Sequence, residues 1–358
     1  MRKIIRQILC IIIVAFCTSS LFVACNTSNK EEPTVEIIDM VGDEITVKKN
    51  PTKVACVSRT SYDLLVAFGL SDNIDGAYSK NLDNAWAPIL YPDSANHYKY
   101  DYEPSYELLL SRGVDLVLCP EQRIAQGLRE HGITAITISL YGNPTFDNSL
   151  TFIADLAIKL WDDESVKQKA TEWKTNVQTT IDSIQRQIPS QETQKKLFYV
   201  RGDKDKGINY TDTKGSFVEY AYRVLGFNCM SATLGYDGTR PSAESICEFN
   251  PDIFVMGGVY QNKHVEDIKS TAPYTTLAAV QNNQIYTIPM GFTQMEQINA
   301  FTAEFFCDQA NKLYPDVFNF DVKSMMKNSI KKYFGTDVTD TQVEYMLAGL
   351  SPTGGNLY

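Results

Sequence analysis

The stretch PSYELLLSRGVDLVLCPE (residues 104–121) combines a short helix with a buried strand. Ser105 precedes a run of three leucines and is a residue type that caps helix N-termini, while Gly113 is a type that ends helices. Asp115 then opens the continuous apolar run at 116–119, which is typical of a strand covered on both faces. The stretch therefore predicts one helix–strand unit of an α/β fold.

A second stretch, PSAESICEFNPDIFVMGG (residues 241–258), repeats this order of features. Ser242 takes the capping place, and Asp252 opens the second apolar run. In the two stretches Glu107 and Glu244 each precede the aspartate by eight residues. An acidic residue in the first turn complements the helix dipole, which alone could explain one glutamate. The matched spacing instead indicates equivalent elements of two similarly built lobes.

Strand-like and helical segments alternate on both sides of a long helical stretch, residues 151–188, in which acidic residues at 162–164 mark a bend or a fresh helix start. This alternation predicts an α/β fold of two lobes with mainly parallel sheets, joined by a long rigid inter-lobe helix. A chain of 358 residues suits two domains. A hairpin is expected at 35–50, and the last eight residues are expected to form a loose tail. The predicted boundaries are 1–24 for a signal peptide, 25–34 for a lipidated tether, 35–147 for the N-terminal lobe, 148–189 for the inter-lobe helix, 190–320 for the C-terminal lobe, and 321–358 for C-terminal helices and tail.

The N-terminus has the pattern of an export signal. Three basic residues precede a short apolar segment, and Ala24 and Cys25 end that segment. The sequence LFVAC resembles the lipobox of bacterial lipoproteins, in which the cysteine is lipidated and becomes the mature N-terminus. The alternative is an ordinary signal peptide in which Cys25 is incidental. The lipoprotein interpretation predicts a membrane-anchored protein on the extracytoplasmic face, in the periplasm or on the outer surface.

Charge and side-chain chemistry exclude several function classes. The net charge of −10 argues against nucleic acid as a partner. The three histidines form no spaced set with carboxylates or cysteines, so neither a bound metal ion nor a cofactor is expected. Five cysteines follow the predicted cleavage site and are expected to be free thiols; they are Cys56, Cys119, Cys229, Cys247 and Cys307.

The segments DMVGDEITVKKNPTKVACVS and SYDLLVAFGL resemble the opening of class III periplasmic substrate-binding proteins. The resemblance covers roughly residues 35–320. It implies a monomer that captures a metal chelate, foremost a ferric siderophore or other iron complex, between two lobes and delivers it to an ABC permease with its ATPase subunits. It also implies that Glu107 and Glu244 dock to arginines of the permease. Cobalamin or another corrinoid, heme held by a tyrosine, and an oxyanion remain alternatives within this fold.

Ligand groups are expected beyond the carboxyl ends of the strands, where open α/β sheets bind ligands. The arginines and a lysine there predict an electropositive cleft for carboxylates or catecholates, with aromatic rings as flat walls. Arg59 and Arg201 could instead pair with neighbouring acids such as Asp63 or Asp203. The predicted ligand-binding residues are Arg59, Lys80, Trp86, Tyr100, Tyr141, Arg201, Tyr210, Arg240, Tyr260 and Phe292.

Two other function classes are alternatives to a binding protein. An exported enzyme is not expected, because the sequence holds neither a G-x-S-x-G elbow nor a phosphate-cradling glycine loop. The adjacent glycines in VMGGVY are interpreted as a tight turn near the ligand. A surface adhesion module would need neither a cleft nor matched glutamates. A coloured iron or corrin chromophore in the purified protein would discriminate transport from both.

Overall fold

A computed structural model of the chain describes residues 32–141, 149–189, 195–235, 238–290, 293–355 and 357. Residues 34–358 form one compact unit. Cys25 and Phe292, the predicted signal peptide and most of the predicted tether lie outside the described residues.

The described chain opens with the predicted hairpin. Strands β1 (Thr34–Ile38) and β2 (Glu44–Lys48) pair antiparallel, with Val35 opposite Val47. The Asp39 carboxylate accepts hydrogen bonds from the backbone N–H groups of Val41 and Asp43, which closes the turn between the strands.

The first parallel sheet has five strands in the order β5-β4-β3-β6-β7, with β3 at its centre. All residues of β3 and β6 are buried, as their continuous apolar runs predict. Its strands are β3 (Val54–Cys56), β4 (Ile74–Tyr78), β5 (Tyr98–Tyr100), β6 (Leu116–Cys119) and β7 (Ala135–Thr137), and the helices between them are α2 (Arg59–Ala67), η1 (Ser71–Asn73), α3 (Ser79–Leu82), α4 (Ala87–Leu90), η2 (Pro92–Asn96), α5 (Tyr106–Arg112) and α6 (Gln122–Glu130).

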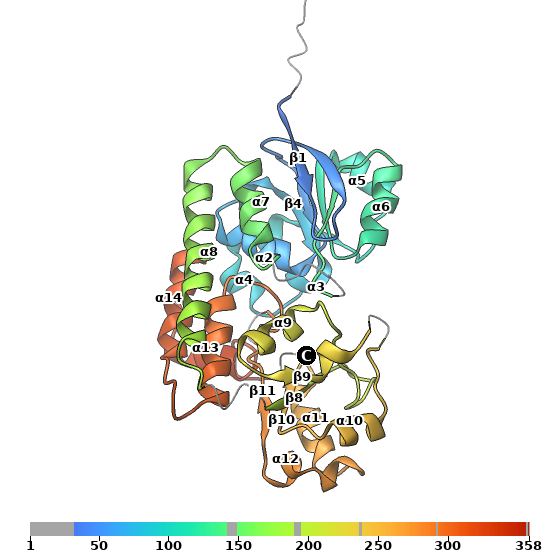
Figure 1. The fold of residues 1–358 in the computed structure, drawn as a ribbon. Coiled ribbons are helices and arrows are strands. Elements are labelled where there is room, and N and C mark those ends of the chain that lie inside the picture. Colours follow the sequence, from blue (N-terminus) through green and yellow to red (C-terminus); the bar gives the residue numbers. More distant parts are fainter. Residues whose placement is uncertain are drawn as a thin grey trace, which may run out of the picture. The chain divides into compact units, whose positions relative to one another are not determined.

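The second parallel sheet has the order β11-β10-β8-β9 (Figure 1). Read from β9, it matches the order β4-β3-β6-β7 of the first sheet, with β8 in the place of β3 and β10 in the place of β6. Its strands are β8 (Lys196–Arg201), β9 (Asn228–Cys229), β10 (Ile253–Gly257) and β11 (Ile285–Thr287), and its helices are α9 (Phe217–Val224), η4 (Met230–Thr233), α10 (Ala243–Phe249), α11 (Gln261–Ile268), η5 (Tyr274–Thr276) and α12 (Ala278–Gln281).

The two quoted stretches form the equivalent units α5–β6 and α10–β10. The Ser105 and Ser242 side chains cap the two helices by accepting a hydrogen bond from the backbone N–H three residues on. Both helices end at a left-handed residue, Gly113 with φ 69° in the first and Asn250 with φ 49° in the second. The same backbone path therefore follows from similar capping residues.

Two charged side chains, an aspartate and a lysine, tie each of these helices to its sheet in the same way. The carboxylates of Asp115 and Asp252 accept hydrogen bonds from the backbone N–H groups of Lys53, at 3.1 Å, and Lys196, at 2.8 Å. The ammonium groups of Lys53 and Lys196 in turn donate to the last carbonyl of α5, at 2.7 Å, and of α10, at 3.0 Å. Each aspartate and lysine thus stabilises the start of two adjacent strands and the end of one helix.

Two helices stand where one long helix or two abutting ones were expected. Helix α7 (Phe152–Leu160) ends before Asp163, whose carboxylate caps the N-terminus of α8 (Glu164–Gln185) by accepting from the backbone N–H groups of Ser165 and Val166. The acidic cluster is therefore a fresh helix start. The helices pack side by side, and α8 runs for 22 residues (Figure 1). The predicted α/β fold of two lobes joined by a long helix is confirmed.

Three helices close the chain, α13 (Thr302–Leu313), α14 (Val322–Phe334) and α15 (Asp340–Leu347), of which α14 and α15 lie in the range predicted for C-terminal helices. Helix α13 packs on α8, and α14 packs on α2. The prediction of a loose tail was wrong for the described residues. Directly before the tail, the indole N–H of Trp86 donates to the carbonyl of Leu350 at 2.9 Å. Within the tail, the backbone N–H of Ser351 donates to the carbonyl of Gly355 at 2.8 Å, and Leu357 packs against the main core.

Candidate functional site

A cavity of about 940 Å³ lies at the carboxyl ends of strands from both sheets. On the N-terminal side it is lined by residues that end β4 or follow β3, β6 and β7, and on the C-terminal side by residues that end or follow β8 and β10. This is the edge at which parallel sheets bind ligands, and the volume lies in the range of small-molecule sites.

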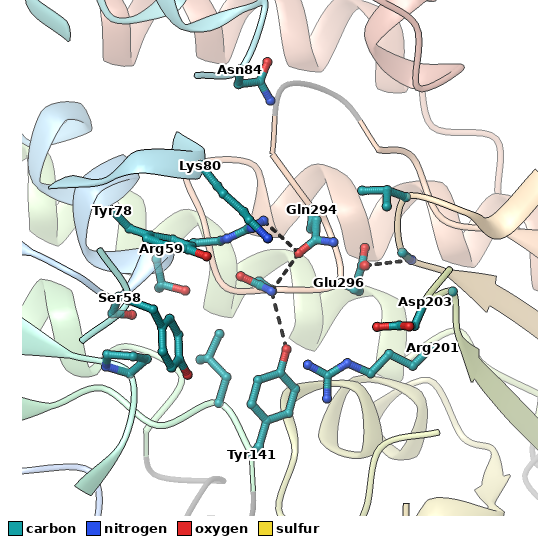
Figure 2. Close-up of a pocket in the computed structure, with 18 of the residues that line it drawn as sticks. Ser58, Arg59, Tyr78, Lys80, Asn84, Tyr141, Arg201, Asp203, Gln294 and Glu296 are labelled. Atoms are coloured by element: carbon teal, nitrogen blue, oxygen red, sulfur yellow. Dashed lines mark hydrogen bonds between the residues drawn. The ribbon is translucent and has the colours of Figure 1, made fainter. Parts of the chain in front are cut away.

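Arg59 begins helix α2, directly beyond the central strand β3, and points into the cavity (Figure 2). Its guanidinium carbon lies 5.4 Å from the ring centre of Tyr78, at the end of β4. The guanidinium donates a hydrogen bond to Oε1 of Gln294 at 3.2 Å. Because Gln294 is neutral, this contact orients the Arg59 charge without neutralising it.

Arg201 ends strand β8 on the opposite side of the cavity. Its guanidinium lies 4.3 Å from the ring centre of Tyr141 and 5.4 Å from that of Tyr210, and it pairs with the Asp212 carboxylate at 3.2 Å. Tyr141 comes from the first lobe, so this stacking links residues of both lobes. Burial raises the pKa of Asp212, although the charge of Arg201 opposes the shift.

The segment between β11 and α13 supplies cavity residues that the sequence analysis missed. Gln294, Glu296 and Gln297 all line the cavity (Figure 2). Gln297 donates to Oη of Tyr141 at 3.4 Å and to Oε1 of Gln294 at 3.0 Å. The Glu296 carboxylate accepts from the backbone N–H of Gly258 at 2.8 Å. The sequence offered a weak signal for this segment, namely polar residues shortly after the last predicted strand end.

The adjacent glycines of VMGGVY permit a close approach of two strand ends. The backbone N–H of Gly202 donates to the carbonyl of Gly257 at 2.9 Å, and a Cβ on Gly202 would lie 2.0 Å from that oxygen. Gly258 has φ +69°, and a Cβ there would lie 2.4 Å from the Gly202 carbonyl oxygen. Both positions therefore require glycine, and both line the cavity.

Half of the predicted ligand-binding residues meet at this cavity: Arg59, Lys80, Tyr141, Arg201 and Tyr260. Tyr210 and Arg240 do not line the cavity; Tyr210 lies beside Arg201, and the guanidinium carbon of the exposed Arg240 is 5.7 Å from the Tyr210 ring centre. Phe292 falls outside the described residues. The structure thus brings together three predicted cations, Arg59 after β3, Lys80 after β4 and Arg201 at the end of β8.

The structure corrects the placement of Trp86 and Tyr100, which are fully buried and do not line the cavity. Trp86 belongs to the main core and is tied to Leu350. Tyr100 ends β5 with its ring in a core cluster of the first lobe, and its hydroxyl donates to the Asp75 carboxylate. Their rings are required for packing, where the hydroxyl and indole N–H also find partners.

The expectation of an electropositive cleft is also wrong for the described residues. Four cationic side chains line the cavity, and so do five carboxylates. The sequence shows which cations follow the strand ends, but not which carboxylates the fold brings beside them. The lining is therefore of mixed charge, with Arg59, Lys80, Arg201 and Lys204 as its cations and Asp83, Glu121, Asp203, Asp205 and Glu296 as its carboxylates.

The two arginines do not pair with the acids considered from the sequence. The buried Asp63 carboxylate accepts hydrogen bonds from the Tyr91 hydroxyl and the Ala300 backbone N–H. Asp203 lies 3.9 Å from the Lys206 ammonium, and Arg201 pairs with Asp212.

Glu107 and Glu244 are both exposed at the first turns of α5 and α10, and neither lines the cavity. Hydrogen bonding to its own backbone N–H is the main cause that lowers the pKa of each carboxyl. Both glutamates therefore present a negative charge to solvent.

With the cavity between two similar lobes described, comparison with known proteins identifies the family. The sequence matches the family model described as periplasmic binding protein over residues 54–290. The chain belongs to the periplasmic binding proteins. The predicted recognition of this family is confirmed, and it assigns the chain to the binding proteins rather than to the enzymes.

Individual proteins resemble this chain at low sequence identity. The uncharacterized ABC transporter substrate-binding lipoprotein YvrC of Bacillus subtilis is 21% identical over 295 residues, which cover 79% of this chain and 87% of YvrC. The structure of molybdate-bound MolA of Haemophilus influenzae has a TM-score of 0.67 and 15% identity, covering 85% of this chain and 99% of MolA. The nickel–histidine complex of Helicobacter pylori CeuE has a TM-score of 0.66 and 18% identity, covering 88% and 99%.

Two further properties of this periplasmic binding protein are visible in the described residues. Among them, the helices are all too short or too polar to cross a membrane. The five cysteines among the described residues are free thiols, as predicted.

Proposed function

We propose that this periplasmic binding protein captures an anionic metal chelate, foremost a ferric siderophore or other iron complex, and delivers it to an ABC permease. The observation that carries the proposal is the pair Arg59 and Arg201, which come from different lobes and line one cavity. Guanidinium groups bind carboxylates and catecholates in a forked geometry. Tyr141 and Tyr260 offer flat faces to the chelate.

The size of the cavity supports a chelate over a bare oxyanion. A volume of about 940 Å³ suits a ligand of drug size, whereas a water molecule occupies only about 30 Å³ of liquid. A tetrahedral anion would leave most of the cavity filled with water. Corrinoids and heme are other large ligands of this class, and a ligand panel separates them from iron chelates.

The proposal includes the membrane and the transporter. Lipidation at Cys25 would hold the protein at the extracytoplasmic face through the polar tether that follows. Glu107 and Glu244 would dock the two lobes to the permease, because both carry an exposed negative charge on equivalent helices. The relative YvrC, which is described as a substrate-binding lipoprotein, supports this arrangement.

The test removes both cavity arginines, as Arg59→Gln with Arg201→Gln. The dissociation constant of a ferric tris-catecholate complex should rise at least about 30-fold by fluorescence titration, because each charged hydrogen bond contributes ~1.5–3 kcal/mol. The control, Arg123→Gln with Arg186→Gln, removes two charges that do not line the cavity. Equal affinity of the parent and the cavity variant would contradict the proposal. Tighter binding of a corrinoid, heme or molybdate by the parent would redirect it to that ligand.

A further inference from the structure

Glu296 is a buried carboxylate of the cavity that is only half satisfied. Glu296 is 7% exposed, and Figure 2 shows its side chain among the lining residues, between Gln294 and Asp203. Oε1 accepts from the backbone N–H of Gly258 at 2.8 Å. Among the described residues, Oε2 has no hydrogen-bond partner. One oxygen is therefore held by the fold, and the other is left for a donor from elsewhere.

Other buried acids near the cavity are treated differently by the fold. Asp212 pairs with the Arg201 guanidinium, and Asp63 accepts from a tyrosine hydroxyl and a backbone N–H. A buried carboxylate oxygen without a donor is destabilising, because it loses its hydration and receives nothing in exchange. The raised pKa of Glu296, about 6 with burial as the main cause, agrees with this incomplete solvation. A group that carries such a penalty at a binding site is commonly there for the ligand.

We propose that Oε2 of Glu296 accepts a hydrogen bond from an N–H or O–H group of the bound ligand. The inference rests on the proposed function, and it narrows the ligand class to chelates that carry a donor beside their anionic groups. Amine, amide and hydroxyl groups of an amino-acid-derived chelator meet this requirement. The mixed charge of the lining fits the same class, because its cations can meet the anionic groups of a chelate while its carboxylates meet the donors.

The substitution Glu296→Gln tests the direction of this hydrogen bond. Its amide oxygen can keep the contact with the Gly258 N–H, which leaves the amide NH₂ where Oε2 was. A donor on the ligand then meets a second donor, so a donor-bearing ligand is rejected. A ligand without donors gains instead, because the repelling charge is gone. Glu296→Ala removes the acceptor without adding a donor.

Two hexacoordinate probes separate these outcomes by calorimetric titration. The bis-histidine complex of nickel(II) carries N–H groups, whereas tris-oxalato iron(III) is anionic and has neither N–H nor O–H groups. The nickel complex should bind the parent and lose about 10- to 100-fold in affinity for Glu296→Gln, with a smaller loss for Glu296→Ala. The oxalate complex should bind Glu296→Gln at least as well as it binds the parent.

Glu304→Gln is the matched control. Glu304 is another buried glutamate whose Oε2 lacks a partner among the described residues, but it lies on α13 outside the cavity lining. Its Oε1 accepts a hydrogen bond from the Ser329 hydroxyl. Glu304 therefore has one hydrogen-bonded oxygen and one without a partner among the described residues, as Glu296 does. This variant should bind both probes within about two-fold of the parent, because it changes the charge of a site that no ligand reaches.

Several results would overturn the inference. Tighter nickel–histidine binding by Glu296→Gln, or unchanged binding by both Glu296 variants, would mean that Oε2 accepts nothing from the ligand. If the parent binds only the oxalate complex, the chelate proposal stands, and the inference that the ligand carries an N–H or O–H donor is wrong. If neither probe binds the parent, titration with the ferric tris-catecholate complex decides the chelate proposal, and the melting temperature of the free protein decides the donor inference. A fall of more than about 2 °C for Glu296→Gln would then show a carboxylate already satisfied within the fold, and no fall would support an acceptor reserved for a ligand.

Discussion

Arg59 and Arg201 face the same cavity but are held by partners of different charge. Arg59 donates to the neutral side chain of Gln294, whereas Arg201 pairs with the Asp212 carboxylate. The charge of Arg201 is therefore largely compensated inside the protein, while that of Arg59 is free to attract an anion. Of the two single substitutions to glutamine, the one at Arg59 should weaken anion binding more.

Asp63 gives the stability of the protein a defined pH dependence. Burial raises its pKa to about 6, although the hydrogen bonds from Tyr91 and the Ala300 N–H oppose the shift. The native state therefore holds this proton more tightly than the unfolded chain does. The stabilisation is complete below the unfolded pKa of about 4 and is lost as the pH rises through about 6.

The substitution Asp63→Asn removes this titration. Between pH 4 and pH 6.5 the free energy of unfolding of the parent should fall by up to about 3 kcal/mol relative to Asp63→Asn. Urea unfolding followed by circular dichroism at several pH values measures the difference. Asp101→Asn, at an exposed position, is the control and should track the parent. Parallel profiles for Asp63→Asn and the parent would show that Asp63 stays ionised throughout this range.

At the scale of elements, the units α5–β6 and α10–β10 were predictable because their signals are local. A capping serine, a helix-ending residue and an aspartate before an apolar run all act within a few positions of themselves. The residue that ends the helix differs between the two units. Both Gly113 and Asn250 adopt the left-handed conformation, which costs less free energy for glycine than for asparagine.

The substitution Gly113→Ala tests this helix end. Alanine at φ 69° is strained, so the free energy of unfolding should fall by about 1 kcal/mol. The matched control is Gly127→Ala, in the interior of α6 with open space around a new Cβ, which should stabilise the protein by about 1 kcal/mol. Denaturant unfolding measures both. Equal shifts for the two variants would mean that backbone conformation at Gly113 contributes nothing.

Longer-range features could not be read from local patterns. The division between α7 and α8 depends on Asp163 acting as a cap rather than as an exposed residue of a continuous helix. Trp86 contacts Leu350, which is 264 positions away, so neither its burial nor the ordered path of the tail has a local signal. Tyr100 ends an edge strand, and the sequence does not say which face of the sheet its ring covers.

At the scale of the molecule, the rule that ligands lie beyond strand ends located the cavity but not its whole lining. It found Arg59 and Arg201, which directly follow or end the two central strands. It missed Gln294, Glu296 and Gln297, because they lie on a connecting segment that reaches the cavity only after the lobes have formed. It also counted cations without the carboxylates that tertiary structure brings beside them.

Glu107 and Glu244 form a feature of the whole molecule, because each lobe contributes one of the two glutamates. Both side chains are exposed on equivalent helices, so their separation reports how the lobes are arranged. We predict that Glu107→Ala with Glu244→Ala leaves chelate affinity and melting temperature near those of the parent, since neither residue lines the cavity. Stimulation of the ATPase in the reconstituted transporter should fall at least about 10-fold, because truncating one partner of an interfacial charge pair leaves the other unpaired.

The control, Glu130→Ala with Glu248→Ala, removes two exposed acids from the same two lobes without touching the first helical turns. Equal ATPase stimulation by the two double variants would place the docking surface elsewhere and leave the repeated glutamates as a feature of the shared fold.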